Sequence, residues 1–188
     1  SPSFTNGYGA KMTEPRVVMV VDMQNGVFAT PRYQRDACVR QINRLTRQAD
    51  LVIFIRHAQA GGLEEGSEGF ALLPELEQPS GALYVTKTAC DAFYRTDLEQ
   101  VLAQHDIRAF VICGCATDYC VDTTLRVGAS KGYRITVAED AHTTANRPAA
   151  DAPVLIAHHN DVWRNLTVPG NPVVVKSVDT IVTQWRAN

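Results

Sequence analysis

The stretch RVVMVVD, Arg16–Asp22, decides the fold class of this chain. Its five central residues are apolar, four of them are valine, and charged residues stand at both ends. The run is too short for a buried helix, and its unbroken apolar character is typical of a strand that is covered on both faces. Such strands belong to parallel sheets with helices on either side, so we expect more of them along the chain.

Further runs of the same character bring the predicted strands to six. The other five lie at Leu51–Arg56, Ala82–Thr86, Ala109–Cys113, Tyr133–Ala138 and Pro172–Lys176. Apolar residues spaced three and four apart predict helices between the strands. These faces comprise Cys38, Ile42, Leu45 and Ala49 in the first interval; Val121, Thr124, Leu125 and Gly128 after the fourth strand; and Leu155, His159, Val162 and Leu166 after the fifth.

Two more helices complete the predicted alternation of strands and helices. Thr96 followed by Glu99 fits a capping box at the start of a helix over 96–105, and a last helix is expected over about 178–185. Parallel neighbours need crossover connections, which these helices provide. The chain therefore predicts a three-layer αβα domain of Rossmann-like type with a six-stranded, mainly parallel sheet.

Composition narrows the functional classes. The chain has 188 residues, 45% hydrophobic and 20% charged, which suits one globular domain, expected over 12–188. A net charge of −2 without a basic stripe argues against nucleic-acid binding. Apolar runs stay well short of the ~20 residues that span a bilayer, so no membrane partner is expected.

Cysteine usage and the N-terminal segment indicate the compartment. Five cysteines make an odd count without a disulfide framework, which favours a reducing, cytoplasmic setting. The beginning of the chain lacks the pattern of a signal peptide. Residues 1–11 are polar and glycine-rich, and we expect a cloning remnant or a disordered tail there. The irregular stretch Ala58–Gly81 is long enough to be a lid, a binding loop or a subunit contact.

Three residues at the expected strand ends could form one catalytic unit. Ligands of open parallel sheets bind beyond the carboxyl ends of the strands, where Asp22, Lys87 and Cys120 would lie. A helix start and a nearby ammonium would lower the pKa of the Cys120 thiol, and Asp22 could carry its proton. From spacing alone a small buried cysteine is the commoner outcome, as are a turn-forming aspartate and a solvated lysine.

Four motifs in order make the chain resemble the isochorismatase-like cysteine hydrolase superfamily from about Arg16 to Gln184. They are VVMVVDMQNGVF at Val17–Phe28, KTACDAFYRTDLEQVL at Lys87–Leu102, VICGCATDYCVDTTLRVGASKGY at Val111–Tyr133, and the later AEDAHTT and HHNDVW. The resemblance implies an Asp22, Lys87 and Cys120 triad and a homo-oligomer, commonly a dimer or tetramer. It also implies a cis peptide at Ala116–Thr117 that helps N–H groups near Thr117 and Cys120 to bind an oxyanion.

Departures from the superfamily pattern narrow the expected reaction. Nicotinamidases of this group bind a metal through an Asp-x-His pair and a further histidine, but Ile55 precedes His57 by two residues and Ala58–Gly81 holds no histidine. We therefore expect neither metal nor cofactor. Aryl-carrier isochorismatases lack the nucleophile, whereas this chain keeps Cys120. The resemblance thus favours hydrolysis of a small amide-like C–N bond through a thioester.

Alternatives to this hypothesis use the same residues. They are an enol-ether hydrolase of the isochorismatase type, a domain that binds a small molecule without turnover, and a thiol redox sensor with Cys115 or Cys90 as resolving partner. Zinc on Cys113, Cys115 and Cys120 is disfavoured because a fourth ligand at the usual spacing is missing. Expected pocket residues around the small-molecule substrate, with core packing as the alternative for the aromatic ones, are Gln24, Phe28, His57, Phe93, Tyr94 and Tyr119.

Overall fold

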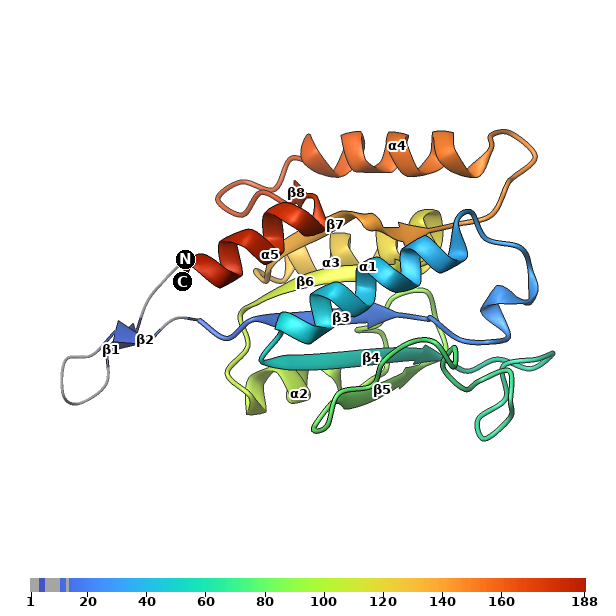
Figure 1. The fold of residues 1–188 in the computed structure, drawn as a ribbon, viewed down its shortest axis with the longest axis horizontal. Coiled ribbons are helices and arrows are strands. Elements are labelled where there is room, and N and C mark those ends of the chain that lie inside the picture. The colour runs from blue at the N-terminus through green and yellow to red at the C-terminus, as the bar shows by residue number, and fades with distance from the viewer. Residues whose placement is uncertain (1–3, 6–10, 13) are drawn as a thin grey trace.

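The computed structural model describes all residues except 1–3, 6–10 and 13. The six predicted strands are confirmed as one sheet in the order β5-β4-β3-β6-β7-β8, and every neighbouring pair is parallel. Their bounds are β3 Val17–Val21, β4 Leu51–His57, β5 Leu83–Lys87, β6 Ala109–Cys115, β7 Arg134–Thr143 and β8 Val174–Lys176. Since the strands are parallel, their carboxyl ends meet at one edge of the sheet (Figure 1).

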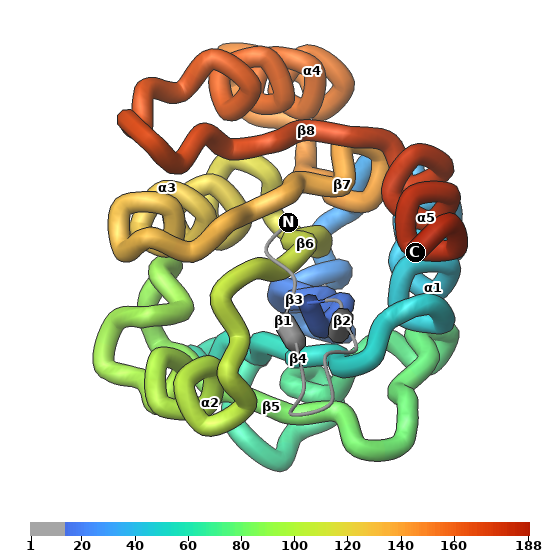
Figure 2. Tube along the Cα trace, turned by 90° about the vertical axis from the view of Figure 1, so that its left-hand side faces the viewer, coloured from blue at the N-terminus to red at the C-terminus, as the bar shows by residue number. Residues whose placement is uncertain are grey.

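Helices cover both faces of the sheet, so the three-layer αβα prediction is confirmed. The helices are α1 Arg35–Gln48, α2 Leu98–Gln104, α3 Asp122–Ser130, α4 Ala152–Arg164 and α5 Val178–Ala187. Figure 2 shows α1 and α5 together on one face and α2 and α3 on the other, with α4 beside β8. A 3₁₀ turn, η1 (Val27–Ala29), and a π-helical turn, η2 (Thr117–Val121), lie in two connections.

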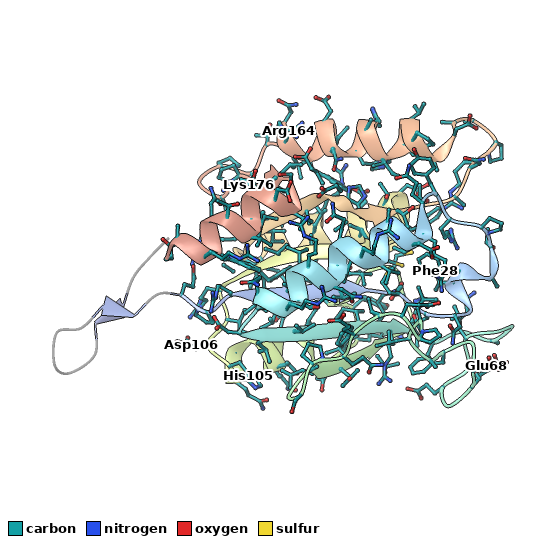
Figure 3. The ribbon with its side chains drawn as sticks, in the orientation of Figure 1. Phe28, Glu68, His105, Asp106, Arg164 and Lys176 are labelled. Atoms are coloured by element: carbon teal, nitrogen blue, oxygen red, sulfur yellow. The ribbon has the colours of Figure 1, made fainter. Side chains whose placement is uncertain are left out.

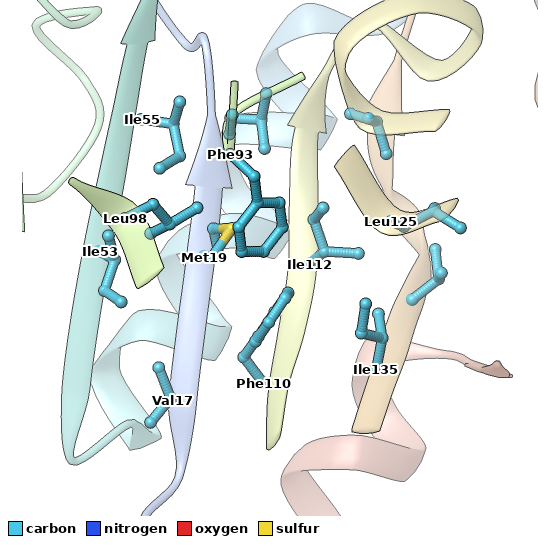
Figure 4. Packing of buried hydrophobic residues seen from close by; sticks show 14 of the residues in the cluster. Val17, Met19, Ile53, Ile55, Phe93, Leu98, Phe110, Ile112, Leu125 and Ile135 are labelled. Carbon is cyan, nitrogen blue, oxygen red and sulfur yellow. The ribbon is translucent and has the colours of Figure 1, made fainter. Parts of the chain in front are cut away.

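The core explains why the strands read as unbroken apolar runs. Along β3, Val17, Met19 and Val21 belong to the cluster beneath α2 and α3, whereas Val18 and Val20 belong to the cluster beneath α1 and α5. Figure 4 shows the first of these clusters, in which Met19 lies among side chains from neighbouring strands. Both faces of the central strand therefore remove apolar surface from water, which is the main stabilising contribution to the domain.

One local prediction about the helices is wrong, and a second is confirmed only in part. The capping box at Thr96 and Glu99 does not form: α2 begins at Leu98 behind Asp97, and the Thr96 hydroxyl accepts from the Leu98 N–H at 3.3 Å instead of the Glu99 N–H. The same hydroxyl donates to the Ala92 carbonyl. The expected inward face of α4, at Leu155, His159, Val162 and Leu166, is only half-buried. The helix covers the β8 side of the sheet and is held instead by Ala152 and Trp163, its two fully buried residues.

The N-terminal prediction falls largely outside the described residues. Of the segment 1–11, β1 (Phe4–Thr5) pairs antiparallel with β2 (Lys11–Met12), and the rest is not described. Within the described part of the chain, no helix is long and apolar enough to cross a membrane.

Close packing of β3 against β6 sets the position of the site. Gly114, near the end of β6, has φ +116°, and a Cβ there would lie 2.2 Å from the Val21 carbonyl oxygen. Glycine is required because any side chain would force the two strands apart. In Figure 3, Phe28 and Glu68 lie at the carboxyl edge of the sheet, and His105 and Asp106 lie at the opposite edge.

Candidate active site

The Lys87 ammonium brings together the residues predicted to form a triad. Lys87 ends β5 and is 1% exposed. Its Nζ lies 3.0 Å from Asp22 Oδ2 and 3.2 Å from Cys120 Sγ. Asp22 follows β3, and Cys120 lies in η2 after β6, so three separate connections meet at this one cation.

Two further acceptors surround the same ammonium. His57 Nδ1 lies 2.7 Å and the Ala89 carbonyl oxygen 2.9 Å from Lys87 Nζ. His57 Nε2 lies 2.9 Å from Gln59 Oε1, which can only accept, so the hydrogen-bond network assigns the imidazole proton to Nε2 and leaves Nδ1 as acceptor. The three ammonium hydrogens thus face four acceptors, all of them groups of the described residues.

Asp22 carries a carboxylate oxygen with no hydrogen-bond partner. The residue is 3% exposed, with φ 51°, and its backbone N–H donates to the Ile55 carbonyl at 2.9 Å. Oδ2 pairs with Lys87, whereas Oδ1 is buried and unpartnered. Leaving a buried acceptor without a partner costs stability, which is common at functional sites, and this oxygen is available to take a proton.

The expected lowering of the Cys120 pKa is wrong. Burial and the Asp22 carboxylate raise the pKa of the Cys120 thiol well above its usual range, although Lys87 opposes them. Burial lowers the pKa of Lys87, but the effect of Asp22 and Cys120, which raise it, is larger. The pKa is therefore raised overall, and the group stays an ammonium. The prediction counted the helix start and Lys87, which lower the pKa of the thiol, but the thiol is buried and shares Lys87 with the Asp22 carboxylate.

The cis peptide bond joins Cys115 to Ala116, so the expected position at Ala116–Thr117 is one residue too late. The Ala116 carbonyl accepts hydrogen bonds from the N–H groups of Tyr119 and Val121, both at 3.1 Å. The Ala116–Thr117 peptide is therefore already part of the helical turn, whose geometry requires a trans bond.

The π-helical form of η2 changes which N–H groups are free. In an α-helical turn the Ala116 carbonyl would accept from Cys120, four residues on. Here Tyr119 and Val121 take that acceptor instead. The Cys120 N–H therefore does not donate to the Ala116 carbonyl. It lies just before the following helix α3, whose positive end stabilises an anion. The sequence pattern placed such donors near Thr117 and Cys120 but did not predict the π turn.

A chain of buried and partly buried hydrogen bonds fixes the position of the Thr117 side chain. Its hydroxyl oxygen lies 2.7 Å from His142 Nδ1, and His142 Nε2 lies 2.8 Å from Asn160 Oδ1. The Asn160 amide in turn donates to the Glu139 carbonyl at 3.1 Å. Burial lowers the pKa of His142 to about 4, so the imidazole is neutral and accepts from Thr117 at Nδ1. In the sequence, His142 belongs to the AEDAHTT motif, but the motif gave this histidine no role.

Because His142 is buried in its neutral form, we expect the stability of the fold to depend on pH. Its pKa is about 4 in the folded chain against an ordinary 6.5, so the unfolded chain binds the proton more readily. The contribution of His142 to the free energy of unfolding is fully present above pH 6.5. It is lost as the pH falls toward 4, by up to about 3 kcal/mol. Urea unfolding of wild type and His142→Gln between pH 7 and 4.5 measures it. If wild type and His142→Gln lose the same free energy of unfolding over this pH range, His142 is not the group responsible.

Several expected pocket residues have other roles. Gln24 is wholly buried; its amide donates to the His57 and Phe70 carbonyls, both at 3.0 Å, and its carbonyl accepts from the His57 N–H. It therefore ties the long loop to β4 and is not exposed to a ligand. Phe93 is 9% exposed and stacks on Tyr133 in the core, with centroids 5.6 Å apart.

The remaining aromatic candidates lie at the surface or the rim. Tyr94 and Tyr119 are about half exposed, at 49% and 51%. The Arg147 guanidinium lies over the Tyr119 ring at 4.6 Å and pairs with Asp118 at 2.9 Å. Phe28 is half-buried in η1 at the same edge of the sheet. Of the six expected pocket residues, His57 is the one whose side chain hydrogen-bonds to a side chain of the predicted triad.

Three of the four acceptors around Lys87 also have the chemistry of a metal site. The ligand atoms of Asp22, His57 and Cys120 all lie within 4.8 Å of one another. A metal ion on these atoms would have to displace the Lys87 ammonium, which contacts all three residues. The donor set therefore suits the lysine side chain rather than an added cation.

Comparison with known proteins identifies the family. Residues 16–162 match the isochorismatase domain family, and the chain belongs to the isochorismatase family of hydrolases. The secreted isochorismatase effector Isc1 of Verticillium dahliae is 31% identical over 154 residues, which cover 77% of this chain and 80% of that protein. The ureidoacrylate amidohydrolase RutB of Methylorubrum extorquens is 36% identical over 87 residues, covering 46% of this chain and 35% of that protein.

A solved structure shares the whole fold. A cysteine hydrolase from Pseudomonas syringae pv. phaseolicola superposes with a TM-score of 0.82 at 20% identity, covering 92% of this chain and 93% of that one. The sheet order and helix layers described above are therefore those of isochorismatase-family hydrolases.

Proposed function

We propose that this protein hydrolyses a small amide-like C–N bond through a thioester on Cys120, without a metal ion. The observation that carries the proposal is the buried Lys87 ammonium bonded to both Asp22 and Cys120, with Asp22 Oδ1 left free. A binding module has no need of a thiol, a carboxylate and an ammonium packed together away from water, because each is costly to bury.

In the first half of the reaction, Cys120 attacks the substrate carbonyl. The resting thiol is neutral, and Asp22 Oδ1 takes its proton as the C–S bond forms. The Cys120 N–H and the start of η2 stabilise the oxyanion of the tetrahedral intermediate. The C–N bond then breaks, the amine takes the proton from Asp22, and an acyl thioester stays on Cys120.

In the second half, water replaces the amine. Asp22 accepts a proton from water, the resulting hydroxide adds to the thioester carbonyl, and the C–S bond breaks. The thiolate recovers the proton from Asp22, which releases a carboxylic or carbamic acid and restores the resting enzyme. Lys87 holds Asp22 and the sulfur in one place through both halves and stabilises negative charge on either.

Hydrolysis of an amide is favoured over that of an enol ether. An enol ether offers no carbonyl for a thiol to attack, so that reaction leaves the buried Cys120 without a role. The similarity to a relative named as an amidohydrolase points the same way, although it covers less than half of this chain.

Intact-protein mass spectrometry tests the proposal. Wild type and Cys120→Ser are mixed briefly with small amides, ureido acids and isochorismate-like enol ethers. We expect wild type to gain the mass of the acyl half and Cys120→Ser to gain none. Turnover of an amide without any adduct, in wild type quenched at early times, would argue against a thioester. Turnover of enol ethers alone would favour the second reaction.

A further inference from the structure

The loop between β3 and α1 carries a half-buried guanidinium that meets no carboxylate. Arg32 Nε donates to the Val27 carbonyl at 3.0 Å, and among the described residues no acidic side chain pairs with Arg32. Its neighbours differ: Arg35 pairs with Glu75 at 2.9 Å, and Arg147 pairs with Asp118 at 2.9 Å. Arg32 is thus a partly desolvated cation with guanidinium nitrogens available for bonding.

The chain around Arg32 is fixed against the predicted catalytic turn. The Tyr33 N–H donates to the Thr144 carbonyl at 2.9 Å, and the Thr143 hydroxyl donates to the Tyr33 carbonyl. The Thr144 hydroxyl donates to Asp118 Oδ1 at 2.6 Å, and Asp118 lies two residues before Cys120. The residue after Arg32 is therefore connected to η2 by two successive contacts, at the carboxyl edge of the sheet.

Arg32 also acts electrostatically on the residue that ends β6. Burial raises the pKa of the Cys115 thiol to about 12, and Arg32 and Arg147 both oppose that rise. Cys115 ends β6, beside Asp22, and is itself wholly buried. Both guanidiniums therefore lie within electrostatic reach of the point where the chain turns into η2.

Most charged groups at this edge of the sheet have a partner of opposite charge. Lys87 balances Asp22, Arg147 balances Asp118, and the Cys120 thiol is neutral because its pKa is raised. Two arginines at this edge, Arg32 and Arg56, have no counter-charge among the described groups. The Arg56 guanidinium lies 4.8 Å from the ring centroids of both Phe70 and Tyr84, so its faces are already covered, and Arg32 is the one left for a ligand. A cation partly removed from water gains most from a planar carboxylate, which a guanidinium binds with two parallel hydrogen bonds.

We propose that Arg32 binds a carboxylate of the substrate, so that the enzyme acts on amides or ureido compounds that carry a free acid. The proposal rests on the proposed function, since the acid must accompany the C–N bond presented to Cys120. It assigns Arg32 to substrate binding and gives it no part in bond making or breaking.

Binding to a protein that cannot turn over tests the proposal directly. Calorimetry on Cys120→Ala would compare short ureido acids, from N-carbamoylglycine to N-carbamoyl-γ-aminobutyrate, with their methyl esters. We expect the best acid to bind about tenfold to a hundredfold more tightly than its ester. Adding Arg32→Ala should remove this preference, and Arg32→Lys should keep part of it.

Two controls make the assignment specific. Arg40→Ala removes an exposed arginine of α1 that has no ion pair among the described residues, and should leave the preference unchanged. Arg147→Ala should weaken it less than Arg32→Ala does, because Asp118 already neutralises Arg147. Equal binding of acid and ester, no binding of any acid, or loss of the preference only in Arg147→Ala would overturn the proposal. Acids that bind but never acylate wild-type Cys120 would contradict the proposed function alone.

Discussion

Replacing Cys120 by serine is expected to lower turnover by about a thousandfold or more while leaving the fold intact. The hydroxyl keeps the size of the thiol and its contact with Lys87. An alcohol is far less acidic and less nucleophilic than a thiol, and Asp22 is a weak base for it. Steady-state turnover of any substrate found by mass spectrometry, together with thermal unfolding, measures both halves of the expectation.

Cys90→Ser is the matched control for this substitution. Cys90 is an exposed thiol that follows Ala89, whose carbonyl contacts Lys87. We expect its replacement to change turnover by less than about twofold, as for other surface changes that leave the reacting groups in place. Substantial turnover in a correctly folded Cys120→Ser protein would refute the thioester mechanism. A large loss in Cys90→Ser would instead direct attention to a paired-thiol reaction.

Replacing Lys87 by methionine is expected to destabilise the fold by about 3–5 kcal/mol. The methionine side chain has similar length, but Asp22 would then be left as an uncompensated buried carboxylate, which is the costly outcome when one partner of a buried ion pair is removed. The side chains of Lys87 and Asp22 are 0% and 4% exposed, so water cannot take over the lost contact. Urea unfolding at neutral pH measures the loss.

Two further variants separate charge from packing. Lys131→Met removes a cation whose partner Glu99 lies at the surface, where the side chains are 40% and 52% exposed, and should cost less than about 1 kcal/mol. Combining Lys87→Met with Asp22→Asn removes both charges and should recover most of the stability but no activity. If the double variant is as unstable as Lys87→Met alone, the loss comes from packing and the electrostatic explanation fails.

Much of the sheet was predictable because its strands are short and buried on both faces. Val17–Val21 leaves no other interpretation than a central strand, and its carboxyl end then locates Asp22 without further information. Lys87 and Cys120 required the resemblance to a superfamily as well, because a lysine after a strand or a cysteine at a helix start is common in unrelated proteins. Their meeting at one point follows from the parallel register of β4, β5 and β6 with β3.

What could not be predicted depends on contacts between distant segments. The raised pKa of Cys120 follows from burial and from sharing Lys87 with Asp22, neither of which spacing reveals. Gln24 resembled a pocket residue at a strand end, but its amide donates hydrogen bonds to the backbone carbonyls of His57 and Phe70. The missing counter-charge of Arg32 is likewise visible only once its neighbours are paired. The expected homo-oligomer and cytoplasmic setting stay predictions.

The three-way meeting at Lys87 also makes catalytic activity a late event in folding. Asp22, Lys87 and Cys120 come from connections far apart in the chain, and the sheet order β5-β4-β3-β6 requires four strands to be in register before the three side chains touch. Contacts of such long sequence separation form slowly, whereas α1 or α3 can form from local contacts alone. Recovery of activity after dilution from denaturant therefore reports the pairing of these four strands, and a chain with native helix content in which they are not yet paired is inactive.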